Sequence, residues 1–194
     1  MVRQASVLPA CSRTGAMTAE TDAGSADDAP SNGEIGVAVV TISAGGTIED
    51  DAGGDAIVDA FGADEREIAI RELIDRGHDN VQAKVSRLID RDDVDIIVTA
   101  GGTGIEPEDA TVEAVRPLLE KELSAFSELF YALAFDEIGT KAVTSRTLAG
   151  VSDRTPVFCL PNEPVATSTA VESIIVPEAD RLVALANGPD SAGA

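Results

Sequence analysis

Two runs of aliphatic and β-branched residues most strongly limit the folds that this chain can adopt. Residues 35–42 read IGVAVVTI and residues 94–99 read VDIIVT, and neither run alternates polar with apolar positions. A strand with apolar side chains on both faces must be covered on both faces, which is typical of parallel sheets in α/β proteins. We therefore expect these two strands to lie inside a sheet that helices cover on both sides.

The rest of the chain fits this expectation, because strand-like and helix-like segments alternate. Further strands are predicted at 67–74, where Ile68 and Ile70 should share one face, and at 157–160. In the helix predicted over 111–123, Pro117 should cause a kink or mark a new first turn. The other helices are predicted over 54–61, 79–90, 124–135, 165–175 and 177–186. This alternation predicts a three-layer α/β/α domain with a doubly wound, mainly parallel sheet.

The domain should occupy residues 34–187. Residues 1–33 are rich in Ala, Ser, Asp, Gly and Pro and lack apolar periodicity, so we expect a disordered, acidic N-terminal tail, and residues 188–194 should form a short C-terminal tail. No apolar run approaches the roughly 20 residues of a membrane span. The pattern favours a cytoplasmic protein without membrane contact.

The charge excludes one class of partner. The chain has 35 acidic and 14 basic residues, a formal charge of −21, and such a surface repels the phosphate backbone of nucleic acids. Only three of the basic residues are lysines, so the composition favours a halophilic source, with an acidic protein of an ordinary cytosol as the alternative.

The scarcity of cysteine and histidine restricts the available chemistry. Cys11 and Cys159 cannot form a disulfide scaffold, and Cys159, within an apolar run, should be a buried and unreactive thiol. His78 is the single histidine. Any catalysis should therefore depend on carboxylates, backbone amides and a metal ion.

Three loops follow predicted strands, at 43–51, 100–109 and 161–164, and ligands of open α/β sheets bind at this edge. The middle loop contains Gly101-Gly102-Thr103-Gly104, where backbone amides could surround a phosphate without interference from Cβ atoms. It matches neither the Walker A nor the GxGxxG pattern. A tight turn without a ligand is the alternative.

Asp109 follows the glycine loop and precedes the predicted helix at Thr111. It is either a helix cap or a carboxylate that holds Mg²⁺ together with substrate phosphates. Glu49, Asp50 and Asp51 in the first loop are candidate partners, or else an acidic first turn that the helix dipole favours.

Three segments, in order, resemble one known family. They are VTISAGGTIEDDAGG at 40–54, IIVTAGGTGIEPED at 96–109 and AFSELFYALAFDEIGTKAVTSRTLAG at 125–150. The chain resembles molybdenum cofactor biosynthesis protein B and the molybdopterin adenylyltransferases (MoaB/MogA type) over residues 35–178.

The resemblance implies a trimer or hexamer that binds molybdopterin. Active members transfer AMP from ATP to the terminal phosphate of the pterin, with Mg²⁺ required and pyrophosphate released, and a downstream protein then inserts the metal. Asp109 and Asp75 would be catalytic, and Asp109 would hold the metal. The resemblance places substrate binding at Ser43, Asp51, Gly101, Gly102, Thr103, Gly104, Ser145, Arg146, Pro161 and Asn162.

The chain departs from the family pattern at three places. Ala44 follows Ser43, and Glu163 follows Pro161-Asn162 in a loop that is usually Pro-Gly. At the family's second carboxylate the simplest alignment puts Arg76, with Asp75 one place away. A non-catalytic pterin-binding or assembly homologue is therefore the alternative function. A carboxylate of Asp75 that reaches the pocket of Asp109 would favour the enzyme.

Overall fold

A central six-stranded sheet organises the molecule, in the strand order β2-β1-β3-β6-β5-β4. The structure, a computed structural model, describes residues 35–188. The strands are β1 (Gly36–Ser43), β2 (Glu67–Asp75), β3 (Ile96–Ala100), β4 (Lys121–Glu122), β5 (Leu148–Ser152) and β6 (Thr155–Leu160). Strands β2, β1, β3 and β6 are parallel, whereas β5 is antiparallel to both of its neighbours. The predicted mainly parallel sheet is confirmed.

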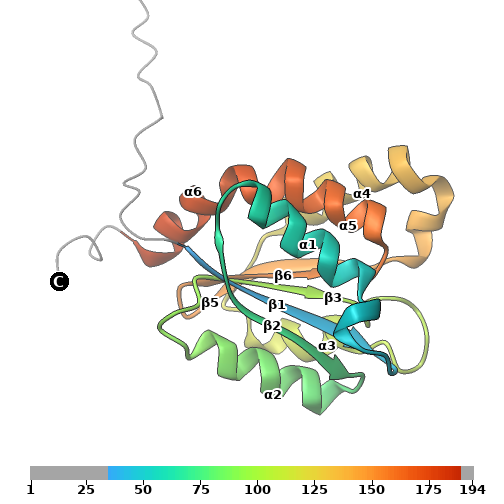
Figure 1. The fold of residues 1–194 in the computed structure, drawn as a ribbon, viewed down its shortest axis with the longest axis horizontal. Helices are drawn as coiled ribbons and strands as arrows, with labels where there is room; N and C mark the ends of the chain where they lie inside the picture. Colours follow the sequence, from blue (N-terminus) through green and yellow to red (C-terminus); the bar gives the residue numbers. More distant parts are fainter. Residues whose placement is uncertain (1–34, 189–194) are drawn as a thin grey trace, which may run out of the picture.

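Helices cover both faces of the sheet, as Figure 1 shows. The helices are α1 (Ala52–Ala63), α2 (His78–Ile89), α3 (Thr111–Val115), α4 (Ser124–Ile138), α5 (Pro164–Ala170) and α6 (Val176–Asn187), and a π-helix at Val171–Ile175 joins the last two. Helices α1, α4, α5 and α6 pack on one face, and α2 and α3 pack on the other. The predicted three layers are therefore confirmed.

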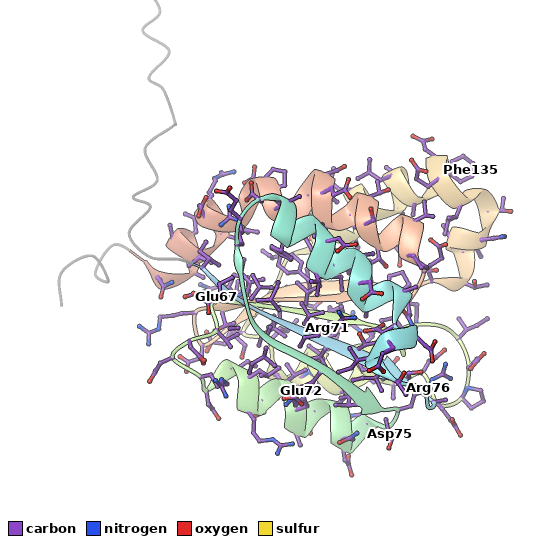
Figure 2. The ribbon with its side chains drawn as sticks, viewed as in Figure 1. Glu67, Arg71, Glu72, Asp75, Arg76 and Phe135 are labelled. Atoms are coloured by element: carbon purple, nitrogen blue, oxygen red, sulfur yellow. The ribbon has the colours of Figure 1, made fainter. Side chains whose placement is uncertain are left out.

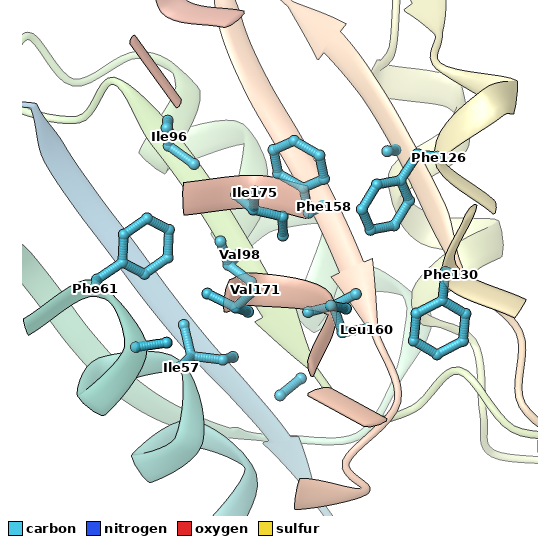
Figure 3. Close-up of a cluster of buried hydrophobic side chains, with 14 of the residues drawn as sticks. Ile57, Phe61, Ile96, Val98, Phe126, Phe130, Phe158, Leu160, Val171 and Ile175 are labelled. Carbon is cyan, nitrogen blue, oxygen red and sulfur yellow. The ribbon is translucent and has the colours of Figure 1, made fainter. Parts of the chain in front are cut away.

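The continuous apolar runs form the strands buried on both faces. In β1, Val37 and Val39 face the larger core, and Ala38 and Val40 face the smaller one. Figure 3 shows the larger core, where Phe126 packs against Phe158 with their ring centroids 5.1 Å apart. Cys159 is fully buried in the smaller core, where burial raises the pKa of its thiol to about 12, so the predicted burial of this thiol is confirmed.

Some local predictions are wrong. A bulge between Val37 and Ala38 shifts the register of β2, so Ile68 packs on the larger core and Ile70 on the smaller one, not on one face. The helix predicted over 111–123 ends at Val115 and is followed by a short 3₁₀ turn at Arg116–Leu118 that leads into β4, so Pro117 marks a new first turn, as expected. Neither β4 nor β5 is predicted from the sequence.

The predicted tails lie almost entirely outside the described residues. Residues 1–33, including Cys11, and residues 189–194 are not described, and Gly188 caps the end of α6 with φ +73°. Within residues 35–188, no helix has the length and apolar character that crossing a membrane would require.

Helix α4 leaves large apolar side chains in solvent. Phe126 and Phe130 pack into the core, but Leu129 is 54% exposed and Phe135 is 59% exposed. Figure 2 shows Phe135 at the surface of α4. Because this helix carries more apolar surface than one subunit buries, we expect part of it to pack against a neighbouring subunit.

We therefore predict that the purified chain is an oligomer and that Leu129→Glu or Phe135→Glu shifts it toward the monomer, since a buried carboxylate would be unpaired at the interface. Light scattering in molar KCl measures the mass. Leu185→Glu, at a position 68% exposed on α6, is the control and should leave the mass unchanged. A monomeric mass for the wild type at micromolar concentration would contradict the expectation.

Candidate functional site

The ends of β1, β3 and β6 bring the three predicted loops to one edge of the sheet. These strands are adjacent and parallel, so their carboxyl ends lie side by side. Residues 101–110 follow β3, between the loop after β1 and the loop after β6. A pocket of about 270 Å³ opens at this edge, and its lining consists of Gly104, Ile105, Glu106, Asp109, Glu113 and Arg146.

The glycine loop has no room for side chains at its first two positions. Gly101 has φ +104°, and a Cβ atom there would collide with the carbonyl oxygen of Ile42. Gly102 has φ +62°, and its Cβ would collide with Oγ1 of Thr111. Thr111 also ties the two ends of the loop together, since its Oγ1 donates to the carbonyl of Gly101 (2.8 Å) and its N–H to that of Gly102 (2.9 Å).

Several donors of this loop remain without acceptors. The N–H group of Gly101 donates to the carbonyl of Leu160, but those of Gly102, Thr103 and Gly104 donate to no group of residues 35–188. The hydroxyl of Thr103, in a side chain that is almost fully buried, also has no hydrogen-bond partner there. Buried polar groups are usually hydrogen-bonded. These donors therefore indicate a place for an anion.

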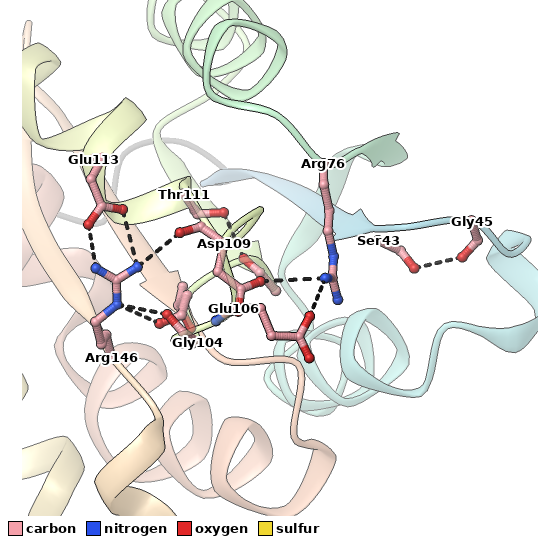
Figure 4. Close-up of polar contacts among 11 residues, drawn as sticks. Ser43, Gly45, Arg76, Gly104, Glu106, Asp109, Thr111, Glu113 and Arg146 are labelled. Carbon is pink, nitrogen blue, oxygen red and sulfur yellow. Dashed lines mark hydrogen bonds and ion pairs between the residues drawn. The ribbon is translucent and has the colours of Figure 1, made fainter.

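Arg146, a predicted substrate-binding residue, holds the outer side of the loop. Its Nε donates to the carbonyls of Thr103 (3.0 Å) and Gly104 (2.9 Å), and its Nη2 donates to that of Asp109 (3.1 Å). Both of its Nη atoms contact the carboxylate of Glu113 (Figure 4), and these hydrogen bonds lower the pKa of Glu113. The arginine therefore orients the loop, while the adjacent Ser145 accepts a hydrogen bond from Tyr131 at its carbonyl (3.3 Å).

The carboxylate of Asp109 lies next to the glycine loop but does not cap a helix. Its side chain is only 7% exposed, and its Oδ2 accepts a hydrogen bond from the N–H of Glu106 (3.1 Å). Ala110 occupies the N-cap position of α3, where no side chain caps the helix. The helix-cap alternative for Asp109 is therefore wrong, and its Oδ1 faces Arg76 across 3.7 Å.

The structure brings Arg76, rather than Asp75, to Asp109. Asp75 ends β2 with an exposed side chain that has no hydrogen-bond or ion-pair partner among residues 35–188, and Figure 2 shows it beside Arg76 at the end of the strand. Arg76 forms an ion pair with Glu106 (2.8 Å), and the pKa of its guanidinium is raised by this hydrogen bond and by the nearby charge of Asp109. The aligned position of the second carboxylate is thus next to Asp109 in space, but it carries a cation.

Asp51, predicted to bind substrate, is built into the fold. Its Oδ1 accepts from the N–H of Gly54 (2.9 Å) at the start of α1, and its Oδ2 accepts from Oγ1 of Thr41 (2.6 Å) and from Nη2 of Arg71 (3.4 Å). In contrast, Glu49 and Asp50 are exposed. Ser43 donates its hydroxyl hydrogen to the carbonyl of Gly45 (2.6 Å) and so shapes the start of the first loop.

The third loop also has a structural explanation for its unusual residue. Glu163 is the N-cap of α5, and its Oε2 accepts from the N–H of Ala166 (2.7 Å). Asn162 packs so closely on Gly53 that a Cβ atom at Gly53 would collide with the amide oxygen of Asn162. The carbonyl of Pro161 accepts a hydrogen bond from the hydroxyl of Thr167 (2.7 Å). Asn162 does not adopt a left-handed backbone, and Glu163 is directed to its own helix rather than to a ligand.

The carboxylate of Asp109 could contribute one ligand to a magnesium ion. No group of three or more His, Cys, Asp or Glu side chains within residues 35–188 could form a complete metal site. Magnesium usually takes one or two carboxylates and completes its shell with water and substrate phosphates. Asp109, with Oδ1 free of hydrogen bonds within this part of the chain, could supply one such ligand.

Two contributors to the site are not predicted from the sequence. Glu106 lies within the family segment 96–109 without a predicted role, and Glu113, outside the three segments, contacts Arg146 from 33 positions away. The one sequence signal for Arg76 is that it aligns with the position of the family's second carboxylate.

The chain is thus an α/β domain with a glycine loop beside one nearly buried aspartate. Residues 37–181 match the family model described as "Probable molybdopterin binding domain". The chain belongs to this family.

Individual relatives agree with this assignment. Molybdenum cofactor biosynthesis protein B of Staphylococcus epidermidis is 38% identical over 159 residues, covering 78% of this chain and 89% of that protein. The Escherichia coli K12 protein of the same name is 35% identical over 144 residues, covering 74% and 85%. A crystal structure of a molybdenum cofactor biosynthesis protein B superposes with a TM-score of 0.76 at 32% identity, covering 80% of this chain and 97% of that chain. The resemblance predicted from the sequence is confirmed.

The contacts of Asp51 predict a large effect on stability. Asp51→Ala removes a helix cap and leaves Thr41 and Arg71 without a buried partner, so the free energy of unfolding should fall by about 2–4 kcal/mol. Urea unfolding measures it. Asp59→Ala removes an exposed carboxylate from the same helix and should change stability by about 0.5 kcal/mol or less. Equal effects of the two substitutions would contradict the structural role of Asp51.

Proposed function

We propose that this protein acts in molybdenum cofactor biosynthesis, where it binds molybdopterin and transfers AMP from ATP to the terminal phosphate of the pterin. One observation carries the proposal: the N–H groups of Gly102–Gly104, which donate to no group of residues 35–188, lie beside the nearly buried carboxylate of Asp109. Amides and a carboxylate at one place suit a phosphate together with its counter-ion. The names of the relatives support the pathway.

The proposed reaction needs positioning more than a nucleophile from the protein. An oxygen of the pterin phosphate attacks the α-phosphorus of ATP, the new P–O bond forms, and the bond to the β-phosphate breaks so that pyrophosphate leaves with the electron pair. The loop amides hold phosphate oxygens, and Arg146 keeps the loop in place through the carbonyls of Thr103 and Gly104. Magnesium, when bound, neutralises charge on the phosphates of ATP. The scarcity of histidine and cysteine is compatible with this chemistry.

One observation favours a second candidate, a pterin-binding homologue without transferase activity. The resemblance implies a second carboxylate next to Asp109, but Arg76 faces Asp109 instead. This edge of the pocket therefore lacks one of the two expected acidic ligands. Both candidate functions use the same pterin site. In each of them the protein acts in the cytoplasm, one step before a protein that inserts the metal. They differ in whether purified wild-type protein converts molybdopterin and Mg-ATP to the adenylylated pterin and pyrophosphate.

We predict that Asp109→Asn lowers the rate of adenylylation by at least ~10²-fold, the scale of one preorganised electrostatic contact to a transition state. The fold should be retained, because asparagine can still accept the hydrogen bond from Glu106. Binding of molybdopterin should survive better than turnover. Product formation is measured by chromatography of the adenylylated pterin.

Glu108→Gln is the matched control, since Glu108 is an exposed carboxylate one position away. It should retain the wild-type rate. Lost thermal stability with normal turnover in Asp109→Asn would contradict a functional role of this residue. Pterin binding without product in the wild type would instead support the second candidate.

A further inference from the structure

Arg76 bridges two elements at the mouth of the pocket. It directly follows β2, and its N–H group donates to the carbonyl of Ser43 at the end of β1 (3.2 Å). Its Nη1 reaches across to Glu106 (2.8 Å) and Asp109 (3.7 Å) in the glycine loop (Figure 4). The guanidinium therefore lies between the first loop and the glycine loop.

Only one nitrogen of this guanidinium is engaged. Its Nε is buried and has no hydrogen-bond partner, and its Nη2 donates to no group within residues 35–188. Because this Nε has almost no exposed surface, a ligand oxygen reaches it only when the side chain of Arg76 or a neighbour moves. A buried N–H group without an acceptor is costly, so a movement that brings it an acceptor would be favoured. The Nε and Nη2 atoms form the side edge of the guanidinium, which matches two oxygens of one phosphate.

The other arginines with comparable features do not offer such an edge at this site. All three guanidinium nitrogens of Arg146 contact the loop or Glu113. Arg71 also has an unpartnered Nε, but its Nη2 is held by Asp51 and Asp55 beside α1. In a chain of charge −21, an incoming polyanion needs a local cation with free donors, and Arg76 can provide one beside Glu106 and Asp109, two residues that line the pocket.

The present partner of Arg76 is easily exchanged. The side chain of Glu106 is 69% exposed, and ion pairs in water contribute little stability. Asp109, which is 7% exposed, would remain beside Nη1 when a phosphate occupies the other edge.

We propose that Arg76 binds a phosphate group of the substrate through its Nε–Nη2 edge. This inference rests on the proposed function only in that the substrates carry phosphates. Because the cation belongs to the protein, a phosphate compound should bind here even without a divalent metal ion, and it should bind more tightly to a planar arginine than to a lysine at this position.

The test is calorimetric titration with inorganic pyrophosphate in 0.5 M KCl and EDTA. We expect Arg76→Gln to weaken pyrophosphate binding by at least ~10-fold, the scale of a charged hydrogen bond, and Arg76→Lys to weaken it by a smaller factor. The control is Arg91→Lys at the opposite end of the sheet, where Nε and Nη2 are already occupied by Asp93. It should leave the dissociation constant unchanged.

Wild-type affinity for pyrophosphate in both Arg76 variants would overturn the proposal. Lower thermal midpoints of the variants with an unchanged dissociation constant would also overturn it, because they would show that Arg76 has a purely structural role. Should Arg76→Gln fail to fold, Arg76→Lys keeps the charge and still decides the question. Arginine-dependent pyrophosphate binding without adenylylation in the wild type would defeat the transferase proposal but support this one.

Discussion

The close approach of two neighbouring strand ends controls the geometry of this site. The chain leaves β3 so close to the carbonyl of Ile42 at the end of β1 that no side chain fits at Gly101. The glycine permits a positive φ there, and Gly102 also adopts a positive φ. Arg146 and Thr111 then hold the loop from both sides, so its free N–H groups are fixed before any ligand arrives.

Alternating charges complete the site within a very acidic protein. Asp109 and Glu106 share Arg76, and Glu113 is neutralised by Arg146, so each carboxylate at the pocket has a guanidinium nearby. This arrangement lets a chain of charge −21 accept an anionic substrate. The two arginines also differ in role. Arg146 donates its hydrogen bonds to the loop and to Glu113, whereas the Nε of Arg76 has no acceptor among residues 35–188.

Much of the fold follows from local sequence, but the directions of the functional side chains do not. Apolar runs predict β1 and β3, and the glycine loop marks the functional edge. Strand β5 is missed because it is a short antiparallel strand whose turn uses Asp153 and Arg154 in left-handed conformations, without glycine. The role of Asp51 depends on Arg71, 20 positions away, and the choice between Asp75 and Arg76 depends on which side chain β2 turns toward Asp109. Such contacts are set by packing rather than by any motif.

The most direct test of the central claim, that the glycine loop is the phosphate-binding part of a molybdopterin site, is a crystal structure of the protein with molybdopterin. We predict that oxygens of the pterin phosphate lie within hydrogen-bond distance of the N–H groups of Gly102–Gly104. A second hollow, of about 300 Å³, lies at the opposite end of the sheet and includes Arg91, Asp95 and Arg154. A pterin phosphate bound in that hollow, with the glycine loop empty, would contradict the account.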